Sequence, residues 1–137
     1  MTTEPEVRVE GVADAALIDR VHEALDELFG QAPEIDDESA MLFRLAVSEV
    51  ATNVVEHAEA REPVLVSVEL RATRDDLTAV FADTAEPALI DLHRVAMPGE
   101  SAESGRGLAI ALAALDELEH ETSDGNTWRL RRALRRD

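Results

Sequence analysis

Residues 49–58 read EVATNVVEHA and place a polar side chain at every fourth position, namely Glu49, Asn53 and His57. Steps of four residues advance only about 40° around a helix axis, so these side chains form one slanted row on a helix expected over residues 39–60. A separate apolar stripe of the same helix could face a sheet and comprises Val47, Ala51, Val54 and Ala58. The polar row either lines a pocket or is a solvated acidic face that ends in a histidine, and this helix alone leaves both interpretations open.

The segments around this helix predict further helices and a set of hairpins. Alternating residues at 64–71 and the run at 77–82 predict two strands joined by a turn, and residues 119–123 and 127–134 predict a final hairpin. A short strand is expected at residues 7–12, a helix capped by Asp14 runs toward Gly30, and a third helix begins near Gly107. Because the helices are segregated from antiparallel hairpins, the fold class is α+β, a two-layer sandwich.

Composition narrows the class of protein. The 137 residues predict one domain, residues 1–137, with its core at about 7–134. Thirty acidic residues stand against 13 basic ones, all arginine, for a net charge of −17. This acidity argues against direct nucleic-acid binding and favours a basic protein partner or Mg2+ beside an anionic ligand, although solubility alone would also account for it. Without cysteine there is no disulfide or thiolate nucleophile, and without a signal peptide or membrane span we expect a cytoplasmic protein with no membrane contact.

Two more segments carry residue types suited to a binding site. Phe81–Pro87 places Asp83 where a hydrophobic strand ends, and a buried carboxylate there can accept a hydrogen bond from an exocyclic amine. Ser104–Ile110 places Gly105 and Gly107 directly before a helix, where the backbone can approach a phosphate. Taken separately, the first could be an ordinary turn aspartate and the second a glycine hinge.

In this order and spacing, the three segments resemble the ATP-binding domain shared by histidine kinases and gyrase (the GHKL superfamily), and within it the bacterial anti-sigma-factor serine kinases. The N-box matches Glu49, Asn53, His57 and Ala58, the first glycine box matches Asp83 and Pro87, and the second matches Gly105, Arg106, Gly107 and Leu108. The resemblance covers about residues 7–134. It implies the Bergerat fold, a mixed and mostly antiparallel sheet with helices on one face.

The resemblance also implies roles for individual residues, with ATP and Mg2+ as cofactors. Glu49 would be the general base toward the attacking hydroxyl, Asn53 an oxygen ligand of Mg2+, and Asp83 the residue that recognises the adenine amino group. The phosphates would meet Gly105, Gly107 and the Leu108 amide below a lid at about residues 91–104. The other nucleotide-binding positions of the motifs are His57, Ala85, Pro87 and Arg106.

The function implied by the resemblance is an ATP-dependent anti-sigma factor. It would sequester a sigma factor and phosphorylate a serine or threonine of an anti-anti-sigma (STAS-type) protein, acting as a homodimer. A helical stripe supports the dimer and comprises Leu17, Val21, Leu25 and Leu28. Two positions depart from the family pattern, since Ala85 replaces a glycine and Glu103 stands where relatives carry an arginine. These departures favour the alternative of a degenerate module that only binds proteins, and an acidic regulator unrelated to nucleotides is a third possibility.

Overall fold

The computed structural model describes residues 4–58, 63–85, 103–122 and 124–134, without the side chains of 103–105. In chain order, the helices and strands are β1 (Glu6–Val12), α1 (Ala15–Gln31), α2 (Asp37–Glu56), β2 (Leu65–Ala72), β3 (Asp76–Asp83), α4 (Glu103–Ala114), β4 (Glu117–Glu121) and β5 (Asn126–Ala133). Within this described part of the chain, none of the helices combines the length and the apolar composition needed to cross a membrane.

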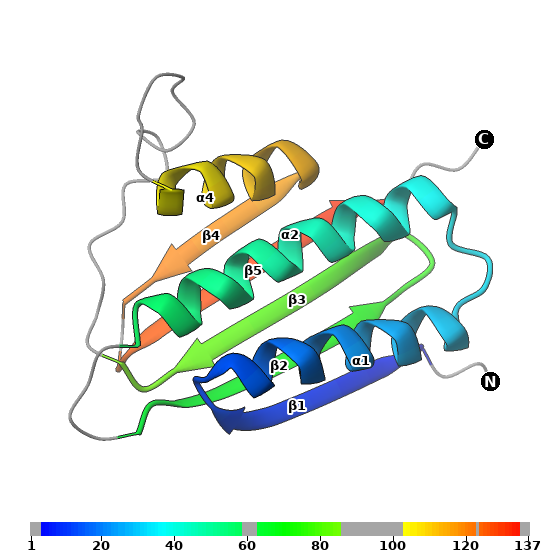
Figure 1. Ribbon diagram of the computed structural model, residues 1–137. Coiled ribbons are helices and arrows are strands. Elements are labelled where there is room, and N and C mark those ends of the chain that lie inside the picture. Colours follow the sequence, from blue (N-terminus) through cyan, green and yellow to red (C-terminus); the bar gives the residue numbers. More distant parts are fainter. Residues whose placement is uncertain (1–3, 59–62, 86–102, 123, 135–137) are drawn as a thin grey trace.

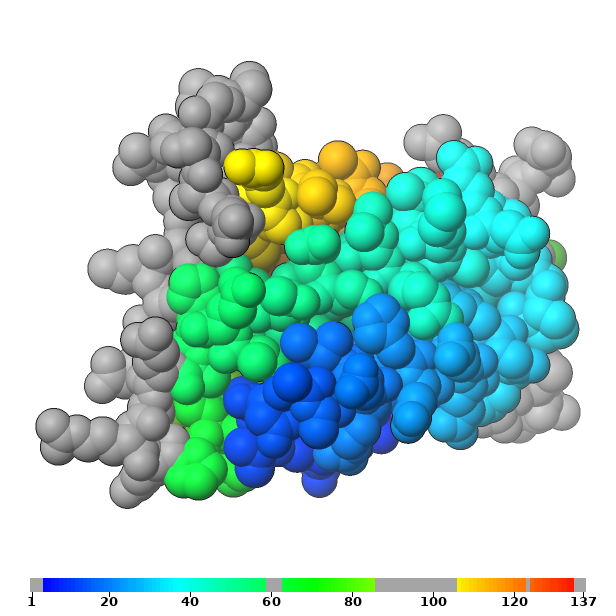
Figure 2. Space-filling view, in the orientation of Figure 1, coloured from blue at the N-terminus to red at the C-terminus, as the bar shows by residue number. Residues whose placement is uncertain are grey.

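The five strands form one sheet in the order β1-β2-β3-β5-β4, and all four pairings are antiparallel. The three helices lie on one face of it, with α1 over β1 and β2, α2 over β3 and β5, and α4 beside α2 and over β4 (Figure 1). Figure 2 shows α1 and α2 side by side on this covered face. The expected α+β two-layer sandwich is therefore confirmed.

The first two helices begin at aspartates, as their sequences indicate. Asp14 Oδ1 accepts a hydrogen bond from the Leu17 N–H at 3.1 Å, and Asp36 Oδ2 accepts one from the Ser39 N–H at 2.9 Å. Each such cap stabilises its helix by about 1 kcal/mol because it satisfies an amide that has no partner in the helix. Together the two caps fix where α1 and α2 start on the sheet.

The apolar stripe of α1 packs inside the chain's own core. Its members are fully buried and comprise Leu17, Val21, Leu25 and Leu28. They lie between α1 and the neighbouring β1, β2 and α2. The stripe is therefore not an exposed interface, and the homodimer prediction rests on the family resemblance alone.

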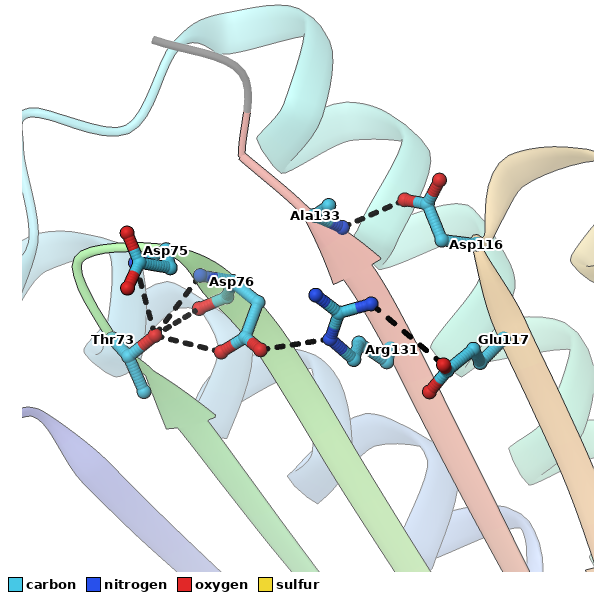
Figure 3. Close-up of polar contacts among 7 residues, drawn as sticks. All are labelled: Thr73, Asp75, Asp76, Asp116, Glu117, Arg131 and Ala133. Atoms are coloured by element: carbon cyan, nitrogen blue, oxygen red, sulfur yellow. Dashed lines mark hydrogen bonds and ion pairs between the residues drawn. The ribbon is translucent and has the colours of Figure 1, made fainter.

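A polar network lies at the β2–β3 turn and extends to β5 and β4 (Figure 3). The Thr73 hydroxyl donates to Asp76 Oδ1 at 2.7 Å, and Arg131 Nε donates to Asp76 Oδ2 at 2.9 Å. Burial raises the pKa of the Asp76 carboxyl, but the Thr73 and Arg131 hydrogen bonds outweigh it and hold that pKa below its ordinary value. Arg131 also lies 3.9 Å from Glu117, so the network joins the β2–β3 turn to β5 and β4.

The prediction that the third helix begins near Gly107 is wrong, because α4 begins at Glu103. Glycine inside a helix costs about 1 kcal/mol relative to alanine. Burial of Leu108 and Ala111 against the core offsets this cost. Gly105 and Gly107 therefore lie within the first turns of α4 and not in a loop before it.

Candidate functional site

The three motif segments converge at one end of the sandwich. In Figure 1 the C-terminal end of α2, the C-terminal end of β3 and the N-terminal end of α4 all lie at the left. The helix α2 packs against both β3 and α4, so it forms the middle of this end. Residues far apart in the sequence thus share one region between the helix layer and the sheet.

The polar row of α2 changes in exposure along its length. Glu49 is half-buried, Asn53 is only 6% exposed, and His57 is exposed as the C-terminal cap of the helix. No other described residue hydrogen-bonds the Asn53 side chain. Among the described residues, Arg132 Nε is the enclosed side-chain nitrogen or oxygen without a hydrogen bond, so the Asn53 amide is open enough to bind a ligand or water. Of the two interpretations of the row, the buried position of Asn53 favours the pocket over a solvated face.

Glu49 lies directly against the second glycine motif. A β-carbon built on Gly107 would lie 2.5 Å from Glu49 Oε2, so only glycine lets α4 approach the carboxylate this closely. The contact brings the N-box together with the second glycine box. Glu49 thereby faces the first turn of α4, where amides without helical acceptors attract anions.

The start of α4 at Glu103 changes which amides are free. Among the described residues of such a helix, the N–H groups of 103–105 have no acceptor within the helix. Gly105 belongs to this set, whereas the Arg106 amide and the predicted Leu108 amide lie beyond it, and the Leu108 side chain is part of the core. The Arg106 side chain is exposed at the same end of the helix. The groups of α4 that could bind a phosphate are therefore the free amides of its first turn and the positively charged Arg106 side chain.

Asp83 ends β3 on the helix-facing side of the sheet, with only 8% of its surface exposed. Its Oδ1 accepts hydrogen bonds from the Ala85 N–H and from Asn126 Nδ2, each at 3.0 Å. Within the described residues both donors use the same oxygen. Asp83 Oδ2 is therefore the oxygen left for an amino group of a ligand.

The alanine that replaces a glycine in the first glycine box fits without strain. Among the described residues, Asp124 is the non-glycine residue with a positive φ, so Ala85 adopts an ordinary backbone conformation. Its side chain is partly buried against the core, and its N–H binds Asp83. The replacement of glycine by Ala85 therefore imposes no strain on the backbone at this position. Pro87 and residues 91–102 of the expected lid lie outside the described residues.

The sequence did not predict two polar residues at this end of the sandwich, Asn126 and His120. Asn126 is 5% exposed and lies opposite Asp83 in the β3–β5 register. His120 Nε2 lies 2.9 Å from Asn126 Oδ1. Gly125, at φ 97°, makes the close approach possible, because a β-carbon there would overlap the Asp83 carbonyl oxygen. The available signal was an asparagine directly after the turn glycine, at the first position of a strand.

The donor set fits a nucleotide-bound Mg2+ better than a protein-held metal. Among the described residues, no cluster of three or more His, Cys, Asp or Glu side chains could hold a metal ion. Mg2+ typically takes one or two protein oxygens and completes its shell with waters and phosphates. The unpartnered Asn53 amide, with Glu49 one turn earlier, matches that requirement.

A pocket of about 470 Å3 also borders Asp83, but its lining belongs mainly to the helix-free side of the sheet. Val12, Leu65 and Ala82 contribute to it from three neighbouring strands. The Asn53 amide, by contrast, is buried on the helix side. We therefore locate the candidate site by the motif residues and not by this cavity.

The fold and the site together define a domain of the nucleotide-binding kinase and ATPase type. The chain belongs to the histidine kinase-like ATPase domain family, which it matches over residues 12–132. Domains of this superfamily bind ATP, typically with Mg2+. No curated protein matches the sequence.

A solved histidine kinase domain, from the Erythrobacter litoralis EL346 blue-light activated histidine kinase, resembles this structure with a TM-score of 0.56. The identity is 19%, and the alignment covers 87% of this chain and 60% of the other. At this identity the likeness supports the fold alone. The present chain spans 60% of the length of that solved chain.

Proposed function

We propose that this protein is an ATP-dependent anti-sigma factor that sequesters a sigma factor and phosphorylates a serine or threonine of a STAS-type antagonist. The observation that carries the enzymatic part is the close approach of the Glu49 carboxylate to Gly107, near the N-terminal end of α4. Phosphoryl transfer depends on positioning and charge stabilisation more than on covalent help. A carboxylate, an amide oxygen and a helix N-terminus supply these needs.

In the proposed reaction, the hydroxyl oxygen of the substrate serine or threonine forms a bond to the γ-phosphorus. Glu49 accepts the proton of that hydroxyl. The bond from that phosphorus to the β-phosphate oxygen breaks, and ADP leaves. Asn53 would hold Mg2+, which when bound supplies charge neutralisation for the phosphates. Asp83 would bind the adenine amino group through Oδ2, while the first turn of α4 and Arg106 face the phosphates.

Charge supports the choice of partners. A net charge of −17 on 137 residues favours association with basic surfaces, and a DNA-facing sigma-factor surface is basic. The same charge would repel an unaccompanied nucleotide, so we expect ATP binding to require Mg2+. Homodimerisation and the identity of both partners remain part of the proposal and derive from the family resemblance.

The second candidate is a binding module without kinase activity. It is favoured by Glu103, which stands where relatives carry an arginine near the second glycine box. In that case the protein would still capture its sigma factor but would not transfer phosphate.

The deciding experiment measures transfer of radiolabelled phosphate from Mg2+-ATP to the antagonist, together with a sigma-factor pull-down. The proposal expects both transfer and capture by the wild type. Capture without transfer would replace the kinase by the binding module. Absence of both, with no calorimetric heat on ATP addition at millimolar Mg2+, would overturn both candidates.

A further inference from the structure

Exposed apolar side chains gather where α2 and α4 adjoin on the helix-covered face (Figure 2). Met41 is 62% exposed, Leu45 40% and Ile110 41%, and these three residues are called the apolar strip below. The other large exposed apolar residues of the described chain, Val12 and Leu65, lie on β1 and β2. A group of exposed apolar side chains on one face of a soluble protein is typical of an interaction surface.

Helix geometry places the members of the apolar strip next to one another. The helices α2 and α4 run antiparallel, because the C-terminal end of α2 and the N-terminal end of α4 lie at the same end of the sandwich (Figure 1). The close approach of Glu49 to Gly107 sets their register. From there, Leu45 lies about 6 Å back along α2 and Ile110 about 4.5 Å forward along α4, in the same direction. The two side chains therefore flank the junction at one level, and Met41 follows one turn further.

The apolar strip begins beside the candidate transfer residue. Leu45 precedes Glu49 by one helical turn and is rotated from it by only about 40° around the axis of α2. On α4, the exposed Arg106 precedes Ile110 by one turn, on the side of the phosphates. A protein whose hydroxyl reaches Glu49 therefore brings its neighbouring residues over the strip. This continuity with the transfer site indicates what kind of molecule covers it.

The far end of the apolar strip is acidic. Asp37 and Glu38 are exposed in the first turn of α2, and neither forms an ion pair with a described residue. Arg44, the basic residue of α2, is already paired with Asp26. The eleven residues from Glu38 to Glu49 span about 16 Å along the helix. The strip thus lies between a transfer site at one end and an uncompensated negative charge at the other, which favours a partner with a basic residue there.

We propose that the apolar strip is the docking surface for the phosphate-accepting protein, which covers it with an apolar segment and places a lysine or arginine beside Asp37 and Glu38, about 16 Å from its acceptor hydroxyl. The inference rests on the proposed kinase function. Docking at this surface holds the hydroxyl near Glu49, which is the positioning that phosphoryl transfer requires. Capture of a sigma factor needs no access to Glu49, so the continuity of the strip with that residue favours the accepting protein as its occupant.

The test uses purified, unphosphorylated STAS-type proteins from the same organism as a panel of acceptors. Calorimetry gives the Kd of each acceptor, and radiolabel transfer gives its KM and kcat. The double variant Leu45→Gln/Ile110→Gln replaces two members of the strip by a polar residue that helices accept. We expect Kd and KM for the acceptor to rise about tenfold, because apolar area is no longer buried on docking. The kcat at saturating acceptor, the Kd for ATP and sigma-factor capture should stay constant.

Two single variants complete the design. Leu65→Gln makes the same change at a residue that is 58% exposed on β2, away from the strip, and should alter none of these quantities. Glu38→Gln should raise the Kd for the acceptor about threefold, and added salt should remove this difference. No effect of Glu38→Gln would overturn the assignment of a basic residue to that end.

The outcomes separate docking from catalysis and from sigma-factor capture. Unchanged Kd and KM in the double variant overturn the proposal, and loss of sigma-factor capture alone would assign the strip to the sigma factor instead. If the double variant does not fold, Met41→Gln at the most exposed member provides the same comparison. A wild type that binds an acceptor without transferring phosphate removes the kinase, and weaker binding by the double variant then still supports the docking surface. A wild type that binds no acceptor of the panel overturns both.

Discussion

Gly107→Ala tests whether the approach of α4 to Glu49 matters for turnover. A β-carbon at residue 107 would lie 2.5 Å from Glu49 Oε2, whereas ordinary van der Waals contact begins at 3.4 Å. The carboxylate oxygen must then move by about 0.9 Å, the difference between these distances, if α4 stays in place. Because this oxygen is the end of a flexible side chain, we expect the side chain to move and the backbone to remain.

The substitution should separate stability from activity. Alanine is the better helix former by about 1 kcal/mol, so the free energy of unfolding should stay constant or rise. Misplacement of a catalytic group by about 1 Å can lower turnover by about 10²-fold. Adenine recognition by Asp83 should persist, since that residue lies on the sheet and not on α4. A slow but stable enzyme that still binds nucleotide is the expected result.

The assay is transfer of radiolabelled phosphate from Mg2+-ATP to the antagonist, with urea unfolding and nucleotide titration on the same protein. Gly30→Ala in α1 is the matched control, because a β-carbon there meets nothing within 4 Å. It adds the same methyl group to a helix and should leave turnover unchanged. Wild-type turnover by Gly107→Ala would refute the reasoning, because Glu49 would then act from another position or not act at all.

Three further substitutions test separate parts of the molecule. Glu49→Gln keeps the shape of the side chain but removes the proton acceptor, so phosphate transfer should fall about 10²–10⁴-fold with little change in ATP affinity, measured by radiolabel transfer and calorimetry. Asp83→Asn should abolish the preference for ATP over ITP in competition titrations while the thermal midpoint changes little. The folded-state pKa of Asp76 is lowered, so its stabilisation is present above its unfolded pKa and is lost as the pH falls through the folded pKa. Asp76→Asn should therefore lower the free energy of unfolding by about 1–3 kcal/mol at pH 7 and show a smaller loss between pH 7 and pH 3 in urea titrations.

The fold was predictable because its signals are local. Asp14 caps α1, and the alternation of residues 64–71 sets the buried face of β2, with no information from distant residues. The same is true of the polar row of α2, whose spacing is a property of one helix. The start of α4 was not predictable in this way. It depends on burial of Leu108 and Ala111 against the core, which outweighs the low helix propensity of two glycines.

The candidate site was predictable only in its motif residues. Glu49, Asn53 and Asp83 belong to segments with recognisable spacing, but the partners of Asp83 depend on strand register. Asn126 faces Asp83 because β5 is inserted between β3 and β4 in the sheet, and His120 follows from the β4–β5 pairing. Pairing between strands that are distant in the sequence produces no periodic pattern, so the sequence does not predict which residues face each other.

The two ends of the candidate site differ in how they are held. The base end rests on three hydrogen-bonded strands, where Asp83 and Asn126 are fixed by main-chain ladders as well as by their own contact. At the phosphate end, the described link is one helix–helix approach, in which Gly107 leaves room for the Glu49 carboxylate. Because Asp83 and Asn126 lie on the sheet and do not depend on the position of α4, selectivity should tolerate changes in α4 that turnover does not. A family fold can thus keep recognition of the base while its transfer activity is lost, since Asp83 lies on the sheet and Glu49 lies on the helix layer.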